Sequence, residues 1–246
     1  MASTTDPAAT NPAATRIFVL TGAGISAESG LGTFRDRGGM WSRFDPMTLA
    51  TPEAFAADPA RVQAFYNLRR RGAIAAVPNA AHRALARLEA GLRARGGGLF
   101  LCTQNVDDLH ERAGSEAVVH MHGRLLGARC LACAASTPWR GDLGPGSACP
   151  ACGAAGRLRP DVVWFGEMPR HLDTIEAALE EADLFVAIGT SGAVYPAAGY
   201  VARARALGIR TLELNLAPSD TAGLFDAARR GPASAVVPAW VADVLG

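Results

Sequence analysis

Four regularly spaced cysteines are the strongest chemical signal in the sequence. Cys130 and Cys133 form one C-x2-C pair, and Cys149 and Cys152 form a second pair after fifteen further residues. Four thiolates at this spacing are typical of a tetrahedral structural zinc site. Because they fill the coordination sphere, we expect the zinc to stabilise part of the fold and to take no part in chemistry. Four unrelated buried thiols are the alternative.

A glycine-rich segment follows the apolar run RIFVLT near the start of the chain. Within GAGISAESG, the residues Gly22, Gly24 and Ala27 fit the pattern G-x-G-x-x-A. Glycines there allow a tight turn and bring a pyrophosphate close to backbone N–H groups at a helix start. An ordinary strand–helix turn gives the same pattern, and the acidic residue usual about 20 positions later is not at a strand end. The segment ELN (213–215) is a better candidate for holding a ribose.

Polar side chains follow two further apolar runs. Gln104, Asn105 and Asp107 come after GLFLCT, while His120 and His122 belong to HMHG after AVV. At the carboxyl ends of parallel strands such groups face a ligand crevice. A histidine placed there can act as a general base near neutral pH. The alternatives are an early-turn role in the next helix for Asp107 and a structural role for each histidine.

The segment QAFYNLRR places an arginine where an apolar residue is expected. Read as a helix, it has one stripe with the spacing i, i+3, i+4 and i+7, formed by Val62, Phe65, Tyr66 and Arg69. On this interpretation Arg70 points outward. A buried guanidinium is costly unless an anion meets it. That anion comes either from a nearby acidic side chain of the protein or from a ligand.

The elements that position these residues alternate along the chain. Strands are predicted at 16–21, 98–103, 117–120, 184–189 and 210–215, and helices within 79–95, 171–182 and 195–208. The alternation predicts an α/β fold with a doubly wound, Rossmann-like parallel sheet. We assign 1–15 to a disordered tail and 16–35, 76–125 and 160–246 to the Rossmann-like lobe. Residues 36–75 and 126–159 form a smaller lobe, a helical insertion plus a zinc ribbon.

Composition narrows the class of protein. The 246 residues carry a formal net charge of +1 without a long run of one sign, which argues against a nucleic-acid surface. The first fifteen residues lack the features of a signal peptide, and no apolar run approaches the ~20 residues of a membrane span. Together with unpaired thiols, these features indicate a cytoplasmic protein.

The motifs together resemble the sirtuins, which are NAD-dependent protein deacylases. The resemblance covers residues 16–240 and rests on GAGISAESG with TFR, TQNVDDLH, HMHG, the two CxxC pairs, GTS and ELN, all in family order. It implies that NAD lies between the two lobes and is consumed with an acylated lysine of another protein. One departure is visible, because this chain has Gly30, Leu31 and Gly32 where the family commonly has Gly-Ile-Pro.

The resemblance also implies roles for individual residues. His122 would be the catalytic base, helped by Asn105. The NAD site would comprise Gly22, Ala23, Gly24, Ala27, Thr33, Phe34, Arg35, Trp41, Gln104, Asn105, Asp107, Gly189, Thr190, Ser191, Asn215, Leu216 and Ala233. The substrate backbone would be flanked by Val162, Trp164, Phe165, Gly192 and Val194. In the family reaction the acyl oxygen attacks the nicotinamide-bearing ribose carbon, the base activates a ribose hydroxyl, and water completes release of lysine and acyl-ADP-ribose.

Within the family, the chain is most similar to bacterial desuccinylases, whose marker is a Tyr-x-x-Arg pair, here Tyr66 and Arg69. Succinyl and malonyl groups end in a carboxylate, which the guanidinium can hold through two N–H bonds while the phenol donates a third. A plain acetyl group would leave the buried cation unpaired. The internal alternative is a salt bridge from Arg69 to Glu53 or Asp58.

These implications define the expected activity. We expect a zinc-containing cytoplasmic monomer that uses NAD to remove succinyl, malonyl and also acetyl groups from lysine, with no nucleic-acid or membrane partner. Nicotinamide, O-acyl-ADP-ribose and free lysine would be the products. The alternatives are a predominant deacetylase, a protein ADP-ribosyltransferase and a module that binds NAD without turnover.

Overall fold

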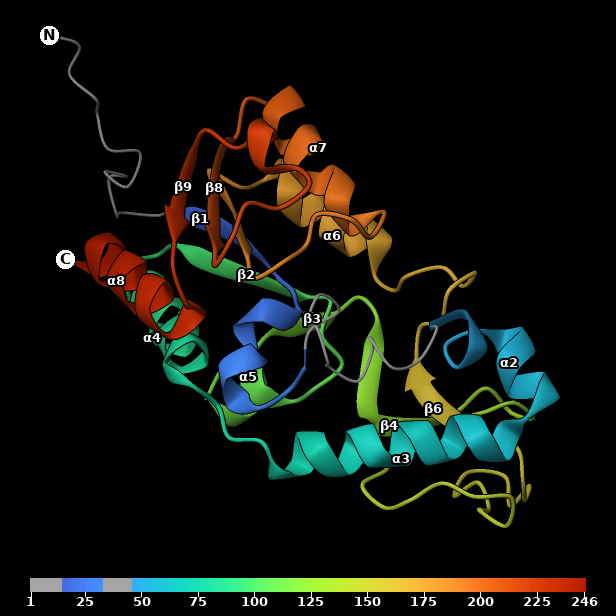
Figure 1. Cartoon of the computed structure of the whole chain (residues 1–246). Coiled ribbons are helices and arrows are strands. Elements are labelled where there is room, and N and C mark those ends of the chain that lie inside the picture. Colours follow the sequence, from blue (N-terminus) through green and yellow to red (C-terminus); the bar gives the residue numbers. More distant parts are fainter. Residues whose placement is uncertain (1–14, 33–45) are drawn as a thin grey trace, which may run out of the picture.

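The computed structural model describes residues 15–32 and 46–246, and a six-stranded parallel sheet runs through it (Figure 1). The strand order is β3-β2-β1-β7-β8-β9, and every neighbouring pair is parallel. The strands are β1 (Arg16–Thr21), β2 (Gly98–Thr103), β3 (Val118–His120), β7 (Leu184–Ile188), β8 (Arg210–Asn215) and β9 (Ala227–Arg230). The chain builds the sheet outward in both directions from β1, so a switch point lies between β1 and β7.

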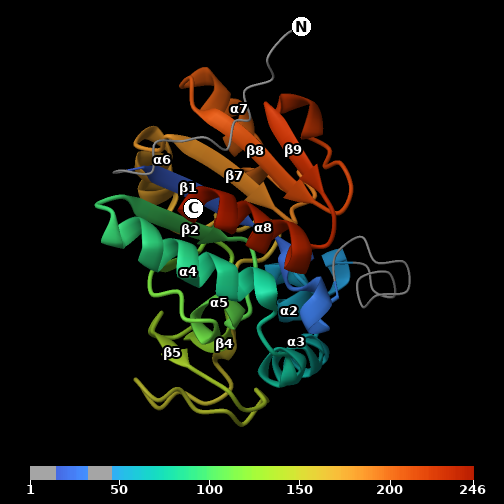
Figure 2. The same ribbon diagram turned by 90° about the vertical axis from the view of Figure 1, so that its left-hand side faces the viewer.

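Helices cover both faces of this sheet (Figures 1 and 2). Helices α4 (Ala80–Ala94) and α8 (Ala233–Leu245) pack on the face that carries Ile17 and Val19. Helices α6 (Leu172–Glu180) and α7 (Tyr200–Ala206) pack on the face that carries Phe18 and Leu20. Successive residues of β1 thus point into two different apolar cores, which is why the strand reads as a continuous apolar run.

A second, antiparallel sheet has three strands in the order β5-β4-β6. They are β4 (Gly123–Cys130), β5 (Ser136–Pro138) and β6 (Leu158–Val162). Helices α2 (Pro52–Ala57) and α3 (Pro59–Ala75) lie against this sheet and share an apolar cluster with it (Figure 1). The remaining short elements are α5 (Leu109–Arg112) and the 3-10 turns η1 (Ala23–Ile25), η2 (Ala27–Ser29), η3 (Pro46–Thr48), η4 (Ala197–Gly199) and η5 (Ala222–Leu224).

The α/β fold predicted from the sequence is confirmed. Three predicted strands, 16–21, 98–103 and 210–215, have the predicted bounds, and the other two are each one residue shorter. The sequence prediction missed β9, because AARR offers little apolar pattern, and α8, because Pro238 interrupts its helical pattern. Two strands of the antiparallel sheet cross the boundaries that we assign at 125/126 and 159/160, and the division into lobes remains our interpretation.

The expectation that Arg70 points outward is wrong. Its side chain is fully buried, and it donates from Nε to the carbonyl of Leu125 at 3.0 Å and from Nη1 to Asn67 Oδ1 at 2.7 Å. Helix α3 is enclosed on more than one side, because the antiparallel sheet also covers a face outside the predicted apolar stripe. The helical spacing of apolar residues does not indicate this second buried face. None of the described helices combines the length and apolar character needed to cross a membrane.

Candidate active site

A cavity of about 650 Å3 lies between the carboxyl ends of the parallel strands and helix α3. The loops that follow β1, β2, β7 and β8 form one side, which we call the strand-end half. Tyr66, Arg69 and Trp164 line the other side, which we call the α3 half. The strand-end half includes the switch point of the sheet, where open α/β folds bind ligands. The volume is in the range of small-molecule and cofactor sites.

Close approach between two loops shapes the strand-end half. Gly22 and Gly24 donate their backbone N–H groups to the carbonyls of Ile188 (2.9 Å) and Gly189 (2.8 Å). A Cβ on Gly24 would lie 2.7 Å from the Gly189 Cα, and Gly189 itself has φ +60°. The glycines are therefore needed for loop packing. The helix start expected after β1 is instead two successive 3-10 turns, η1 and η2.

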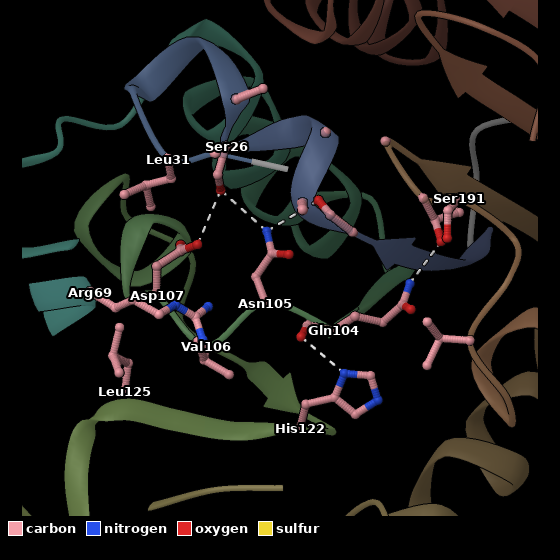
Figure 3. Close-up of a pocket in the computed structure, with 18 of the residues that line it drawn as sticks. Ser26, Leu31, Arg69, Gln104, Asn105, Val106, Asp107, His122, Leu125 and Ser191 are labelled. Carbon is pink, nitrogen blue, oxygen red and sulfur yellow. Dashed lines mark hydrogen bonds between the residues drawn. The ribbon is translucent and has the colours of Figure 1, made fainter. Parts of the chain in front are cut away.

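A buried polar network forms the floor of the cavity next to the β2 loop. Ser26 Oγ donates to Asp107 Oδ2 at 3.2 Å and accepts from Asn105 Nδ2 at 3.2 Å, as Figure 3 shows. Asp107 also accepts from the Leu109 N–H at 3.1 Å, so it both lines the cavity and begins the turn into α5. Burial raises the pKa of the Asp107 carboxyl, and the hydrogen bonds from Leu109 and Ser26 oppose that shift.

A histidine lies behind this network. His82 is fully buried, and its Nδ1 faces the backbone N–H of Asn79 at 3.3 Å while its Nε2 faces Ser26 Oγ at 3.3 Å. Because Nδ1 accepts, Nε2 carries the proton and donates to Ser26, which leaves the serine proton for Asp107. Ser26 was absent from our predicted site residues, although it lies inside the quoted glycine-rich segment and could have been found there.

The two histidines of HMHG have different surroundings. His122 lines the cavity, and its Nδ1 lies 3.1 Å from the Gln104 carbonyl, so Nδ1 carries the proton and Nε2 keeps a lone pair (Figure 3). Burial lowers the pKa of His122, and the Gln104 carbonyl opposes that shift. His120 instead contacts the Asn105 carbonyl at 3.1 Å and Glu111 Oε1 at 2.7 Å, away from the cavity. Of the two histidines, His122 is therefore the one that presents a lone pair within the cavity.

The far end of the strand-end half is held by side chains that follow β7 and β8. Asn215 donates to the Thr190 carbonyl at 2.8 Å, and Gln104 Nε2 donates to Thr190 Oγ1 at 3.0 Å. Of the segment ELN, Leu214 and Asn215 line the cavity. Glu213 is fully buried, where it pairs with Arg230 and accepts from the Ser219 N–H.

The α3 half brings one cation and two aromatic rings together. The Arg69 guanidinium carbon lies 5.6 Å from the centroid of the Tyr66 ring, and the Tyr66 hydroxyl accepts a hydrogen bond from Trp164 Nε1 at 2.9 Å. Burial lowers the pKa of Arg69, which Tyr66 and then Asp107 oppose. Burial also raises the pKa of Tyr66, so its hydroxyl keeps its proton. Arg69 lies beside Asp107 in Figure 3.

The four cysteines converge at one end of the antiparallel sheet. All four Sγ atoms lie within 4.8 Å of one another, and the pairs Cys130–Cys152 and Cys133–Cys149 are each separated by 3.8 Å. A tetrahedral zinc with Zn–S bonds near 2.3 Å requires S–S edges of about 3.8 Å. The four residues therefore fit a structural zinc ion, which they would hold without an open position for a substrate.

The cavity collects almost all the predicted site residues that the structure describes. Those that line it are Gly22, Ala23, Gly24, Ala27, Tyr66, Arg69, Gln104, Asn105, Asp107, His122, Val162, Trp164, Phe165, Gly189, Thr190, Ser191, Val194, Asn215, Leu216 and Ala233. Gly192 is not part of the lining, because its backbone packs against Thr221 and Ser219. Thr33, Phe34, Arg35 and Trp41 lie outside the described residues. The sequence analysis missed lining residues such as Leu31, Val106, Leu125 and Tyr195.

Comparison with known proteins places the chain in a family. Residues 22–196 match the Sir2 family. An NAD-dependent protein deacylase of Caulobacter vibrioides is 61% identical over 230 residues, which are 94% of this chain and 97% of that protein. One of Escherichia coli is 52% identical over 232 residues, which are 94% of this chain and 82% of that protein. The solved complex of a Sir2 homologue with NAD has a TM-score of 0.86 at 40% identity, covering 96% of this chain and 92% of that one. Because the family match spans most of this chain, and relatives more than 50% identical align with 94% of it, the chain belongs to the Sir2 family.

Proposed function

We propose that this chain is an NAD-dependent protein deacylase that prefers lysines carrying acidic acyl groups, succinyl and malonyl. Its relatives of similar length are NAD-dependent protein deacylases, and its family is enzymatic, which supports the reaction class. The preference for acidic acyl groups rests on the α3 half of the cavity.

The preference for acidic acyl groups is supported by the position of the Arg69 guanidinium, which lies among aromatic rings in the α3 half. Arg69 is half-buried against the rings of Phe65 and Tyr66, with 5.7 Å and 5.6 Å from its guanidinium carbon to their centroids. A cation that has lost part of its hydration gains most from an anionic partner with matching geometry. The terminal carboxylate of a succinyl or malonyl group would provide that partner, with Tyr66 as an additional donor.

The internal partners that we considered for Arg69 are poorly placed. Asp58 is at the opposite end of α3 and accepts from the Arg61 N–H at 3.0 Å as the N-cap. Arg69 lies eleven positions after Asp58, a rise of about 16 Å along the helix axis. Glu53 is exposed on the preceding helix, α2. Asp107 is the carboxylate that acts on the charge of Arg69, and Ser26 and Leu109 hydrogen-bond to that carboxylate.

The residues of the strand-end half fit a dinucleotide. They offer amide groups, hydroxyls and a buried carboxylate at the switch point of the sheet, where Gln104, Asp107 and Asn215 would orient the two ribose rings and the nicotinamide. NAD, when bound, would supply the ADP-ribosyl acceptor of the acyl group. Nε2 of His122, which keeps a lone pair, would take the proton from the ribose hydroxyl. Asn105 is held by Gly22 and Ser26 and would fix the position of that ribose.

The test compares kcat/KM on one peptide carrying acetyl-, succinyl- or malonyl-lysine. A charge-assisted hydrogen bond contributes about 1.5–3 kcal/mol, so we expect Arg69→Met to reduce the lead of the acidic peptides by about one to two powers of ten. Arg71→Met, two positions along the same helix and exposed in a pair with Asp142, is the matched control and should keep that lead.

A second variant tests the base. His122→Ala should lower kcat/KM by about 10²–10⁴-fold on all three peptides and leave their ratios unchanged. A wild type that favours acetyl-lysine, combined with an Arg69→Met variant that loses only stability, would identify the chain as a deacetylase and overturn the proposed preference.

A further inference from the structure

The indole of Trp164 is aimed at the hydroxyl that the proposed function places on the acyl carboxylate. Trp164 Nε1 lies 2.9 Å from the Tyr66 oxygen, and an indole N–H can only donate. Arg69 packs against the same residue, with its guanidinium carbon 5.6 Å from the centroid of the Tyr66 ring, and a guanidinium can also only donate. The Tyr66 oxygen therefore accepts the hydrogen bond from Trp164, and the Arg69 guanidinium offers it no acceptor atom.

A phenol oxygen that accepts a hydrogen bond still has its own proton to donate. Burial raises the pKa of Tyr66, so the phenol stays protonated at neutral pH. Neither Trp164 nor Arg69 can take that proton, because neither has an acceptor atom. We infer that Trp164 is a specificity-determining positioning residue, whose indole N–H turns the Tyr66 hydroxyl proton toward the carboxylate of an acidic acyl group. The inference rests on the proposed function, since it requires such a carboxylate in the α3 half.

The surroundings of Trp164 fix the direction of its N–H. The side chain is only 3% exposed, and the guanidinium carbon of Arg159 lies 3.4 Å from the centroid of its ring. Arg159 is itself held by Glu167 through two contacts of 2.6 and 2.9 Å, and Glu167 accepts the backbone N–H of Trp164 at 2.8 Å. The ring of Phe55 packs 5.3 Å away at an angle of 41°. A ring held in this way cannot turn its N–H away from Tyr66.

The inference gives Trp164 a role different from a surface contact with the substrate backbone. Its neighbour Phe165 is 40% exposed and is free to touch a peptide, whereas Trp164 is buried behind Tyr66. Trp164 then acts through the phenol and not by its own contact. Its substitution should therefore lower the ratio of kcat/KM for succinyl- over acetyl-lysine peptide, while kcat on either peptide changes little.

A double-mutant cycle on the ratio of kcat/KM for succinyl- over acetyl-lysine peptide tests this coupling. We expect Tyr66→Phe to lower the ratio about 10- to 100-fold and Trp164→Phe to lower it about 3- to 10-fold, because the released hydroxyl can turn away. In the Tyr66→Phe background, Trp164→Phe should have no further effect on the ratio. Since the carboxylate is remote from the reacting carbon, the loss should appear as a higher KM for the succinyl peptide at little-changed kcat.

Two controls separate positioning from packing. Trp240→Phe makes the same change in another fully buried tryptophan, in α8, and should leave the ratio unchanged even where stability falls. If Trp164→Phe fails to fold, 3-benzothienylalanine at position 164 keeps the bicyclic ring and replaces the N–H by sulfur. It should lower the ratio to the same extent.

The outcomes distinguish this inference from the proposed function. If Arg69→Met and Tyr66→Phe leave the ratio unchanged, the preference for acidic acyl groups itself is wrong. If both lower the ratio but Trp164→Phe and the benzothienyl variant do not, the proposed function stands and the role of Trp164 is overturned. A loss from Trp164→Phe that persists in the Tyr66→Phe background would also overturn it, because Trp164 would then act without the hydroxyl.

Discussion

The two halves of the cavity are built in different ways. In the strand-end half, loops that follow neighbouring parallel strands bring backbone and short polar side chains together, and Gly24 packs directly on Gly189. In the α3 half, Tyr66 and Arg69 come from a helix and Trp164 comes from the segment after β6, and the antiparallel sheet brings these two segments into contact. The first half depends on local loop geometry, while the second depends on packing between segments far apart in sequence.

This difference means that the two halves should respond to different changes. Helix α3 is tied to the cysteine-bearing segment by side-chain hydrogen bonds, since Asn67 bonds both backbone groups of Leu143 at 2.8 Å and Gln63 donates to the Leu158 carbonyl at 3.1 Å. A zinc ion held by the four cysteines should therefore support the α3 half more than the strand-end half.

Removing the zinc should have the largest effect. We expect Cys149→Ser to abolish bound zinc, to lower the melting temperature by about 10 °C or more, and to eliminate turnover of every acyl peptide. Affinity for NAD should fall less than acyl-peptide turnover, because the strand-end loops do not contain the cysteines. Metal analysis, thermal unfolding and calorimetric NAD titration measure the three quantities.

A cysteine elsewhere provides the control for this prediction. Cys102→Ala changes a buried thiol of β2 that belongs to an apolar core, and it should retain the zinc and the order of acyl preference. Equal losses of NAD affinity and acyl-peptide turnover in Cys149→Ser would show that the halves are not separately supported.

Crowding the loops that follow β1 and β7 should have an intermediate effect, and it should act on the strand-end half. In Gly24→Ala the new Cβ would lie 2.7 Å from the Gly189 Cα and 2.8 Å from its oxygen, so the loops must separate. We expect the KM for NAD to rise about tenfold, equivalent to about 1.4 kcal/mol, with the succinyl-to-acetyl ratio unchanged. Steady-state kinetics with varied NAD tests this, and Gly141→Ala, where the new Cβ meets nothing within 4 Å, is the control. A changed acyl ratio would contradict the separation.

Acid should lower the stability of the fold, and it should act beneath the strand-end half. Burial, with a smaller contribution from Arg83, lowers the pKa of His82 to about 4, against about 6.5 in an unfolded chain. Burial and then His82 and His120 also lower the pKa of His110. Between these values the unfolded chain binds protons that the folded chain does not, so the free energy of unfolding falls as pH falls from 6.5 toward 4.

The expected size of this loss is about 2 kcal/mol from His82 between pH 7 and pH 5, with His110 adding to it and no contribution above pH 7. Urea unfolding at the two pH values measures it. His82→Gln should reduce the difference and the exposed His171→Gln should not. Identical midpoints at pH 7 and pH 5 in the wild type would refute the prediction.

The sequence predicted the strand-end half better than the α3 half. Gln104, Asn105 and Asp107 line the cavity because they directly follow a strand, and parallel strands end at one edge of the sheet. The buried state of Arg70 was missed, because helical periodicity shows one apolar stripe and not the sheet that covers a second side. The contact of Trp164 with Tyr66 joins residues 98 positions apart, and no local pattern signals it.

The sequence by itself determined the alternation of strands and helices, the tetrad of cysteines and the polar residues at the strand ends. These features depend on the order and spacing of residues within short segments, where backbone geometry fixes which side chains are neighbours. Only the tertiary structure decided which histidine of HMHG faces the cavity, which arginine of α3 is enclosed, and how Trp164 meets Tyr66. Those outcomes depend on how helix α3, β6 and the strand-end loops pack against one another. Contacts between segments far apart in the sequence do not produce a repeating pattern of apolar residues, so the sequence alone does not predict them.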